Sequence, residues 1–172
     1  MIDTRNVLDE FKNKPHDEIV AELDARGVEL EIAVENTLRD YNMGTIVRTA
    51  NAFGVRHVHV IGRRQWNKRG AMMTDKYLQV HYYATVDEFV KQMTGKVLIA
   101  IENNVASTPL AQAKLPKNTV LLFGQEGPGI SPELLEKAAH VVHIEQLGST
   151  RSLNVASAAA VAMYAWLQQN NL

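Results

Sequence analysis

Three short segments combine polar side chains with small residues in a way that could bind a ligand or assist a reaction. They are residues 42–50 (NMGTIVRTA), 124–131 (GQEGPGIS) and 152–160 (SLNVASAAA). The first offers an amide and a guanidinium, the second a carboxylate inside a glycine-rich turn, and the third a hydroxyl and an amide. Three such segments in one chain predict a single site built from separate parts of the fold.

Most of these polar side chains also have a purely structural interpretation. Asn42, Ser152 and Asn154 stand where apolar helices would begin, and such residues commonly cap helix N-termini. Glu126 would suit an ordinary exposed turn. Arg48 is harder to explain in this way, because its helical neighbours are small and leave room for a ligand. A guanidinium in that setting is a natural clamp for a phosphate or a carboxylate.

The glycine spacing of the second segment disfavours two common nucleotide motifs. Gly124, Gly127 and Gly129 match neither the dinucleotide fingerprint nor a phosphate-binding P-loop, which ends in Lys-Ser or Lys-Thr. The glycines and Pro128 instead predict a tight loop whose backbone can approach a ligand closely, with Glu126 held inside it.

One segment is basic enough to suggest nucleic acid, although the whole chain has a formal net charge of -1 and gives no general case for it. Residues 63–70 (RRQWNKRG) place arginines and lysines around a tryptophan, whose ring could stack on a base. A solvated loop with no ligand is the equally balanced alternative.

The surrounding pattern predicts an α/β fold with a parallel sheet covered by helices on both faces. Nearly continuous Val, Ile and Leu runs alternate with stretches of helical periodicity, which is typical of that architecture. Ligands bind beyond the carboxyl ends of such strands. The loops at 124–129 and 145–152 each follow a strand, so they should open into one pocket. The expected strands cover residues 30–34, 55–61, 97–101, 120–123 and 141–144, and the expected helices lie near residues 46–53, 86–93, 132–138 and 153–167.

Composition limits the organisation of the chain and its chemistry. The 172 residues suit one domain spanning 1–172, with residues 1–28 forming a short helical extension outside the main body. The absence of cysteine excludes disulfides, Cys-ligated zinc and a thiol nucleophile. The histidines are scattered, and His57 and His59 fall at strand periodicity, so we expect structural roles for them and no metal.

No feature of the sequence points to export or to a membrane. The N-terminal residues include several acids and lack the apolar core of a signal peptide. The longest apolar stretch, residues 155–167, is shorter than the roughly 20 residues that a membrane span needs. We therefore expect a cytoplasmic protein with no membrane partner.

Taken together, the three segments resemble motifs one, two and three of the SpoU/TrmH branch of the SPOUT RNA methyltransferases. The resemblance implies a C-terminal trefoil knot, a rare exception among folds, and an obligate homodimer. It also implies S-adenosylmethionine as cofactor and methyl transfer to a ribose 2'-hydroxyl of RNA, most often of tRNA. The likeness spans about Leu30 to Leu167 and rests on Asn42-x-Gly44-x-x-x-Arg48-x-Ala50, Phe123-Gly124-x-Glu126-Gly127-x-Gly129 and Ser152-Leu153-Asn154-Val155.

The functional positions of the family carry over onto residues of this chain. The resemblance implies a catalytic set of Asn42, Arg48, Glu126, Ser152 and Asn154. The implied cofactor contacts are Phe123, Gly124, Glu126, Gly127, Ile144, Leu147, Ser152, Leu153 and Asn154. Under the same interpretation the RNA contacts are Arg48, Arg63, Arg64, Trp66, Lys68 and Arg69.

The family analogy assigns removal of the hydroxyl proton to Arg48, and elementary acid-base chemistry argues against it. A guanidinium with a pKa of about 13 would cost about 8 kcal/mol to deprotonate at neutral pH. We expect instead that Arg48 stays charged, binds the phosphate beside the target ribose and lowers the pKa of the hydroxyl. Asn42 and Glu126 would then position Arg48 and the RNA, while Ser152 and Asn154 would shape the loop.

The sequence departs from the family pattern at two points, and three alternatives remain open. The last strand is followed by Glu145-Gln146, where many members carry Pro-Met, and the chain lacks the long basic extensions of many relatives. The target could be ribosomal RNA instead of tRNA. The methylated atom could be a base nitrogen, as in other SPOUT branches. The third alternative is a non-catalytic RNA-binding assembly factor with the same fold.

Overall fold

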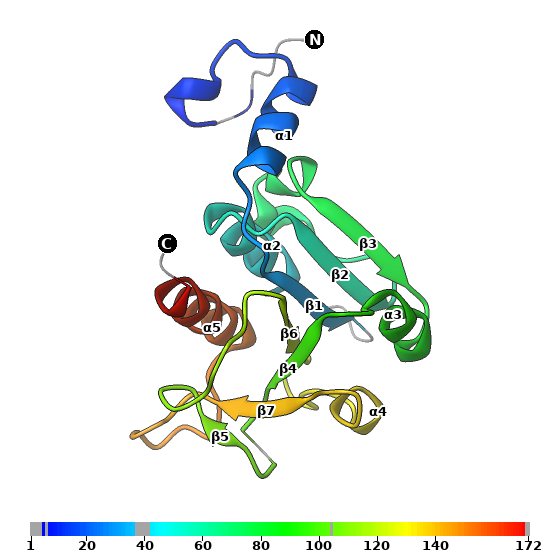
Figure 1. Ribbon diagram of the computed structural model, residues 1–172, viewed down its shortest axis with the longest axis vertical. Helices are drawn as coiled ribbons and strands as arrows, with labels where there is room; N and C mark the ends of the chain where they lie inside the picture. The colour runs from blue at the N-terminus through cyan, green and yellow to red at the C-terminus, as the bar shows by residue number, and fades with distance from the viewer. Residues whose placement is uncertain (1–4, 6, 37–41, 104, 171–172) are drawn as a thin grey trace.

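A seven-stranded parallel sheet forms the centre of the computed structural model, which describes residues 5, 7–36, 42–103 and 105–170. The order is β3-β2-β1-β6-β4-β7-β5, and every neighbouring pair is parallel (Figure 1). The α/β class and the parallel sheet expected from the sequence are therefore confirmed. The strands are β1 (Glu31–Asn36), β2 (His57–Gly62), β3 (Gln79–Tyr83), β4 (Val97–Ile101), β5 (Thr108–Pro109), β6 (Thr119–Phe123) and β7 (His140–His143).

Helices cover both faces of the sheet. Successive residues of a strand point to opposite faces, and the strands carry apolar side chains on both, so each face packs against helices. On one face Ile32 and Leu121 share a core with residues of α2 and α5. On the other face Ala33 and Leu122 share a core with residues of α3 and α4. No helix of the described ranges is long and apolar enough to cross a membrane. The helices are α1 (His16–Ala25), α2 (Asn42–Ala52), α3 (Val86–Gln92), α4 (Pro132–Leu135) and α5 (Val155–Gln169), with 3-10 turns η1 (Asp9–Phe11), η2 (Arg69–Ala71) and η3 (Thr74–Lys76).

Two strands escaped the sequence analysis, and their positions explain why. All five residues of β3 are partly exposed, and the strand pairs only with β2 at the edge of the sheet. The other, β5, has only two residues and pairs with β7 at the opposite edge. A search for continuous apolar runs finds buried central strands and misses edge strands of this kind.

The N-terminal segment attaches at one end of the molecule through a small cluster of its own (Figure 1). Within it, Ile19 of α1 packs with Phe11 and Tyr77. Arg56 is only 5% exposed; its Nε donates to Asp24 at 2.7 Å, and its guanidinium also donates to the Tyr77 carbonyl. Within the helical extension expected here, the structure has the single turn η1 followed by α1.

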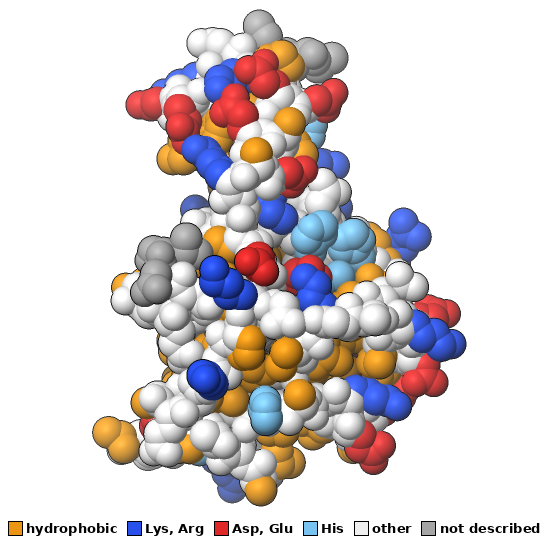
Figure 2. All heavy atoms as spheres, viewed as in Figure 1, with side chains coloured by type: hydrophobic (Ala, Val, Ile, Leu, Met, Phe, Trp, Pro, Cys, Tyr) orange, Lys and Arg blue, Asp and Glu red, His pale blue; other side chains and the backbone are white. Residues whose placement is uncertain are grey.

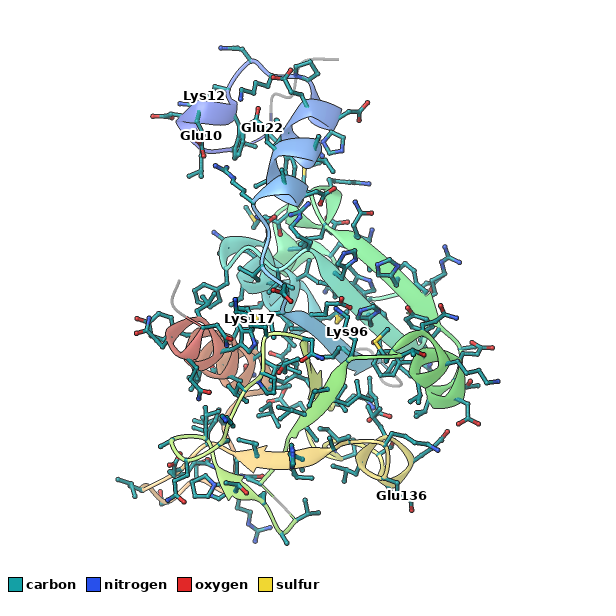
Figure 3. All side chains as sticks on the ribbon, in the orientation of Figure 1. Glu10, Lys12, Glu22, Lys96, Lys117 and Glu136 are labelled. Carbon is teal, nitrogen blue, oxygen red and sulfur yellow. The ribbon has the colours of Figure 1, made fainter. Side chains whose placement is uncertain are left out.

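Three histidines and one acid form a row across β1, β2 and β3, made of two hydrogen-bonded pairs that are joined by stacking of the His59 and His81 rings. His59 Nε2 lies 2.7 Å from Glu31 Oε2, and His57 Nδ1 lies 3.0 Å from His81 Nε2. Lys96, labelled in Figure 3, pairs with Glu31 at 2.5 Å. Figure 2 shows histidines gathered on this face of the molecule. These contacts support structural roles for His57 and His59. In the described residues, no group of three potential ligands could hold a metal ion.

Acidification should weaken the fold through this histidine row. Burial, together with the nearby His59 and His57, lowers the pKa of His81 below its ordinary value of 6.5. The unfolded chain therefore takes up this proton at a higher pH than the folded chain, so stability falls as the pH drops below about 6.5. The pKa of Glu31 is lowered to about 2 despite burial, because His59 and Lys96 bind its carboxylate. The stability that this carboxylate contributes therefore starts to fall only below the unfolded pKa of 4.5.

Urea denaturation at about pH 7.5 and about pH 5.5 measures this effect. The free energy of unfolding should be smaller at the lower pH, and His81→Gln, which removes the titrating ring, should reduce the difference. His140→Gln changes an exposed histidine at the start of β7 and serves as the matched control. An equal pH dependence in the parent and in His81→Gln would contradict the assignment.

Candidate functional site

A pocket opens where the carboxyl ends of β4, β6 and β7 meet the loops that follow them. The loops at 102–103, 124–129 and 144–153 form its walls together with the start of α5, around an open space of about 670 Å³. Every expected cofactor residue lines this pocket except Leu147 and Asn154. Leu147 is fully exposed. The two loops expected to share one pocket therefore do so, as strand ends of a parallel sheet should.

The glycine-rich loop is a tight turn closed by its own backbone. Gln125 and Gly129 exchange two backbone hydrogen bonds, of 3.1 and 3.0 Å. A Cβ on Gly124 would lie 2.0 Å from the Gly129 carbonyl carbon, so only glycine allows this approach. Gly127 and Gly129 have φ angles of +99° and +73°, which side chains rarely adopt. The three glycines thus have conformational reasons and leave Glu126 exposed at the turn.

Two hydrogen bonds join side chains from all three polar segments. Asn42 Nδ2 at the start of α2 donates to Glu126 Oε2 at 2.9 Å. Asn154 Nδ2 donates to Asn42 Oδ1, also at 2.9 Å. These residues are 84 and 112 positions apart along the chain. The structure therefore brings together the amide, the carboxylate and the second amide that the sequence singled out.

The cap of α5 determines the direction of this chain of bonds. Asn154 Oδ1 accepts from the backbone N–H groups of Ala156 and Ser157, at 3.0 and 3.4 Å. Its amide nitrogen must then face Asn42, which turns the Asn42 oxygen toward Asn154 and the Asn42 nitrogen toward Glu126. The same Asn154 side chain therefore caps α5 and bonds to the side chain that begins α2.

Ser152 and Arg48 do not join the hydrogen-bonded group. Ser152 lines the pocket, and its carbonyl accepts from Thr150 Oγ1 at 3.0 Å. Arg48 is exposed on α2, outside the pocket lining, and forms no ion pair with any described residue. It follows Asn42 by six positions, which turns its side chain about 120° around the helix axis from that of Asn42. Arg48 is thus presented to solvent beside the site.

Two residues that the sequence analysis missed tie the pocket loops together. Glu102, just after β4, accepts from Ile130 N through Oε2 at 3.0 Å and from Asn103 N through Oε1 at 2.9 Å. Asn103 Nδ2 donates to the Arg151 carbonyl at 2.8 Å. One polar pair therefore links the glycine-rich loop to the loop before α5. Its signal was available, because Glu102 and Asn103 directly follow a predicted strand.

Another carboxylate, this one buried, fixes the far end of the glycine-rich loop. Glu35 of β1 is 5% exposed and accepts from both the backbone N–H and the hydroxyl of Ser131, at 2.7 and 2.6 Å. Ser131 in turn accepts from Leu134 N and caps α4. The loop is thereby held at both ends, which limits its freedom to move away from the pocket.

The basic segment packs on α2 and presents fewer groups to solvent than expected. Trp66 is only 9% exposed, and its Nε1 donates to Tyr82 Oη at 3.3 Å. Its ring therefore lies in the core and is not displayed for a base to stack on. Lys68 is paired with Asp75 at 2.9 Å, a bond that raises the pKa of Lys68. Arg64 lies over the Tyr82 ring.

Two glycines explain how the basic segment meets the helix that carries Arg48. A Cβ on Gly44 would lie 2.7 Å from Ala71 N, and one on Gly70 would lie 3.0 Å from Thr45 N. This close contact leaves Arg63 and Arg69 exposed on the segment, next to the helix with the exposed Arg48. Arg48 and Arg69 are thus exposed on two elements that pack against each other.

Residues 29–164 match the model of the SpoU rRNA Methylase family. The tRNA (guanosine(18)-2'-O)-methyltransferase of Thermus thermophilus is 31% identical over 145 residues, which cover 81% of this chain and 74% of that protein. The enzyme of the same name from Escherichia coli is 27% identical over 144 residues, and the match covers 81% of this chain. The chain spans 63% of the length of that relative.

A solved structure agrees with the fold. The AdoMet-bound rRNA methyltransferase of Sinorhizobium meliloti superposes with a TM-score of 0.74 at 24% identity, over 87% of this chain and 60% of that one. The family model covers the sheet, the pocket and all three polar segments. The chain therefore belongs to the SpoU rRNA Methylase family.

Proposed function

We propose that this protein transfers a methyl group from S-adenosylmethionine to a ribose 2'-hydroxyl of RNA. The observation that carries the proposal is the bonded group Glu126, Asn42 and Asn154 at the pocket, because it unites the three polar segments. Membership of the family supports the reaction class. The names of the two curated relatives favour tRNA as substrate, and ribosomal RNA is the second candidate.

The pocket residues fit the proposed cofactor. The pocket combines apolar side chains with a few polar ones, as cofactor sites commonly do. Ile144, Leu153 and Val155 in the lining suit an adenine ring, while Glu102 and Glu126 in the same lining complement a cationic ligand. Bound S-adenosylmethionine supplies a methyl group activated by its positive sulfur. The chain itself then has to hold the RNA and assist departure of the hydroxyl proton.

Arg48 best serves this purpose as a charged group. It is exposed and has no ion-pair partner in the described residues, so its guanidinium is available for a phosphate beside the target ribose. A positive charge there lowers the pKa of the ribose hydroxyl, and the proton leaves to water or phosphate. Asn42 is held from two sides and keeps the start of α2 in place beneath Arg48. Arg63, Arg64 and Arg69 extend the proposed RNA surface.

The proposal includes the homodimer implied by the resemblance. Val161 and Tyr164 of α5 are 43% and 53% exposed, and the Tyr164 ring contacts Phe53 after α2. A second copy on this face would cover an apolar patch. Arg48 does not line the pocket of its own chain, and in such a dimer it could lie near the pocket of the partner.

The proposal also includes the C-terminal trefoil knot. In support, β6 lies between β1 and β4 while β7 lies beyond β4, so the order of these strands in the sheet departs from their order along the chain. The segment before β6 then lies against the end of α5, where Trp166 Nε1 donates to the Pro116 carbonyl at 2.7 Å and Gln169 Oε1 accepts from Leu115 N at 3.0 Å. We further propose one domain over 1–172 with residues 1–28 as an extension. An RNA substrate is our reason for a cytoplasmic location.

Removal of Arg48 should abolish methyl transfer and spare cofactor binding. Labelled S-adenosylmethionine is incubated with unmodified tRNA or ribosomal RNA, and nucleosides are identified by mass spectrometry. We expect a 2'-O-methylnucleoside, with Arg48→Ala reducing its rate by about 100-fold or more. Lys91→Ala, on the opposite face of the sheet, is the control.

The Arg48→Lys variant separates the two roles for this residue. Lysine loses its proton far more easily than arginine, so a true base would give activity that rises at high pH. A charged clamp predicts no such rise. A methylated base in place of a 2'-O-methylnucleoside would contradict the reaction, and RNA binding with no methyl transfer at all would favour the assembly factor.

Replacing the Asn42 amide by a carboxylate should weaken ligand binding in the pocket. Asn42→Asp places a carboxylate against Glu126 and removes a hydrogen-bond donor. We expect S-adenosylhomocysteine to bind about tenfold more weakly by calorimetry, since an uncompensated hydrogen bond costs about 1.4 kcal/mol. Thr45→Asp adds the same charge to the same helix at an exposed position and should leave this affinity unchanged. Equal affinities in the two variants would remove Asn42 from the site.

Charge on α5 should separate the two copies. Val161→Glu combined with Tyr164→Glu buries two like charges if the proposed face is an interface, so sedimentation velocity should show a monomer and methyl transfer should fall. Gln92→Glu adds a charge at an exposed position of α3, on the opposite face of the sheet, and should stay dimeric. A parent chain that sediments as a monomer at the concentration of the activity assay would refute the dimer.

A further inference from the structure

Two consecutive methionines are held in a backbone conformation that side chains rarely adopt. Met72 and Met73 lie between η2 and η3 and have φ angles of +47° and +66°. Asn13 is the other non-glycine residue of the described ranges with a positive φ, and asparagine tolerates this conformation better than methionine does. Strained residues of this kind cluster at functional sites, where the surrounding structure holds them in place.

Burial of the two side chains does not account for the strain. Met72 is 67% exposed and Met73 is 53% exposed. The backbone beside them is held by its neighbours, because Thr74 Oγ1 donates to the carbonyl of the buried Ala71 at 2.6 Å and Lys76 N donates to the Met73 carbonyl at 3.1 Å. The turn therefore presents two large apolar side chains to solvent from a fixed backbone.

The surroundings of this methionine pair are basic. Residues 63–76 contain five cations and one acid, although the whole chain has a net charge of -1. The acid, Asp75, has a buried side chain that is paired with Lys68 at 2.9 Å. Arg69 and Lys76 are exposed on either side of the methionines, and both η2 and η3 pack against α2. An apolar pair among cations complements a polyanion that also has apolar faces.

We propose that Met72 and Met73 form an apolar contact for an unstacked base of the RNA substrate, while Arg69 and Lys76 bind the adjoining phosphates. This inference rests on the proposed function and adds RNA contacts beside the helix that carries Arg48. Unpaired RNA offers splayed bases and phosphates together, and methionine sulfur contacts flat rings favourably. A membrane surface is also anionic, but the packing of this turn on α2 favours RNA.

Equilibrium binding of fluorescein-labelled RNA to the full chain tests the proposal. The probe is unmodified tRNA, or ribosomal RNA if that is what the parent methylates. Asparagine tolerates a positive φ, so Met72→Asn combined with Met73→Asn keeps the turn and removes the apolar contact. We expect this variant to bind the RNA about tenfold more weakly. It should also unfold at a urea concentration equal to or above that of the parent, because the strain is relieved.

Three further variants isolate the apolar contact. Met72→Leu combined with Met73→Leu keeps apolar side chains and should bind within about threefold of the parent. Lys76→Ala should reduce the slope of log affinity against log salt concentration by about 1, whereas the asparagine variant should leave this slope unchanged. Leu8→Asn is the matched control, since Leu8 is 66% exposed next to the acidic turn η1, and it should leave RNA affinity unchanged.

The remaining outcomes overturn the proposal in distinguishable ways. Unchanged RNA affinity in the asparagine variant would remove the methionines from the RNA surface and leave the proposed methyl transfer intact. Weaker binding together with unfolding at lower urea would make the pair structural. Loss of the dimer in sedimentation velocity would assign the pair to a contact between copies. Loss of binding to phosphatidylglycerol vesicles, with RNA affinity intact, would assign it to a membrane surface. Failure of the parent to bind either RNA would overturn the proposed function as well.

Discussion

The site depends on one capping interaction, the acceptance of two backbone N–H groups of α5 by Asn154 Oδ1. The first N–H groups of a helix have no partner within it, so the cap has a strong reason to hold. Because the oxygen is committed to the helix, the nitrogen is left for Asn42, and Asn42 is then left with a donor for Glu126. The direction of these hydrogen bonds is therefore set by the need to cap α5, which exists whether or not a ligand is bound.

Two carboxylates position the glycine-rich loop in a similar way. Glu35 holds Ser131 at the start of α4, and Glu102 holds Ile130 one residue earlier. Both acids stand on strands or at their ends, and the sheet therefore sets their positions. Hydrogen bonds from backbone N–H groups to a carboxylate are strong and directional, so they hold the loop in one position. The glycine-rich loop, with little secondary structure of its own, takes its shape from these two attachments and from the bonds between Gln125 and Gly129.

Sequence patterns predicted the parts of this molecule that follow from burial and from the rule for strand ends. The central strands are buried on both faces, so continuous apolar runs located them, and the pocket followed from the loops after β6 and β7. Trp66 shows where local composition misleads, since its neighbours are basic and its ring is nevertheless in the core beside Tyr82. The expectation that Asn154 caps a helix is confirmed. Glu102 directly follows a predicted strand, so its position was visible in the sequence, but its bonds to the backbone of the loop are visible only in the structure.

The charges of the site separate two ligands of opposite sign. Glu102 and Glu126 line the pocket, whereas Arg48, Arg63 and Arg69 are exposed outside it on α2 and the adjoining basic segment. A polyanion is attracted to the second region and repelled from the first, and a cationic cofactor experiences the reverse. The chain has a net charge of only -1, so this division comes from placement and not from total charge. The close packing of Gly44 against the segment at 67–71 keeps the basic region beside α2, whose first residue is bound to the acidic edge of the pocket. The two regions are thereby fixed relative to each other by α2.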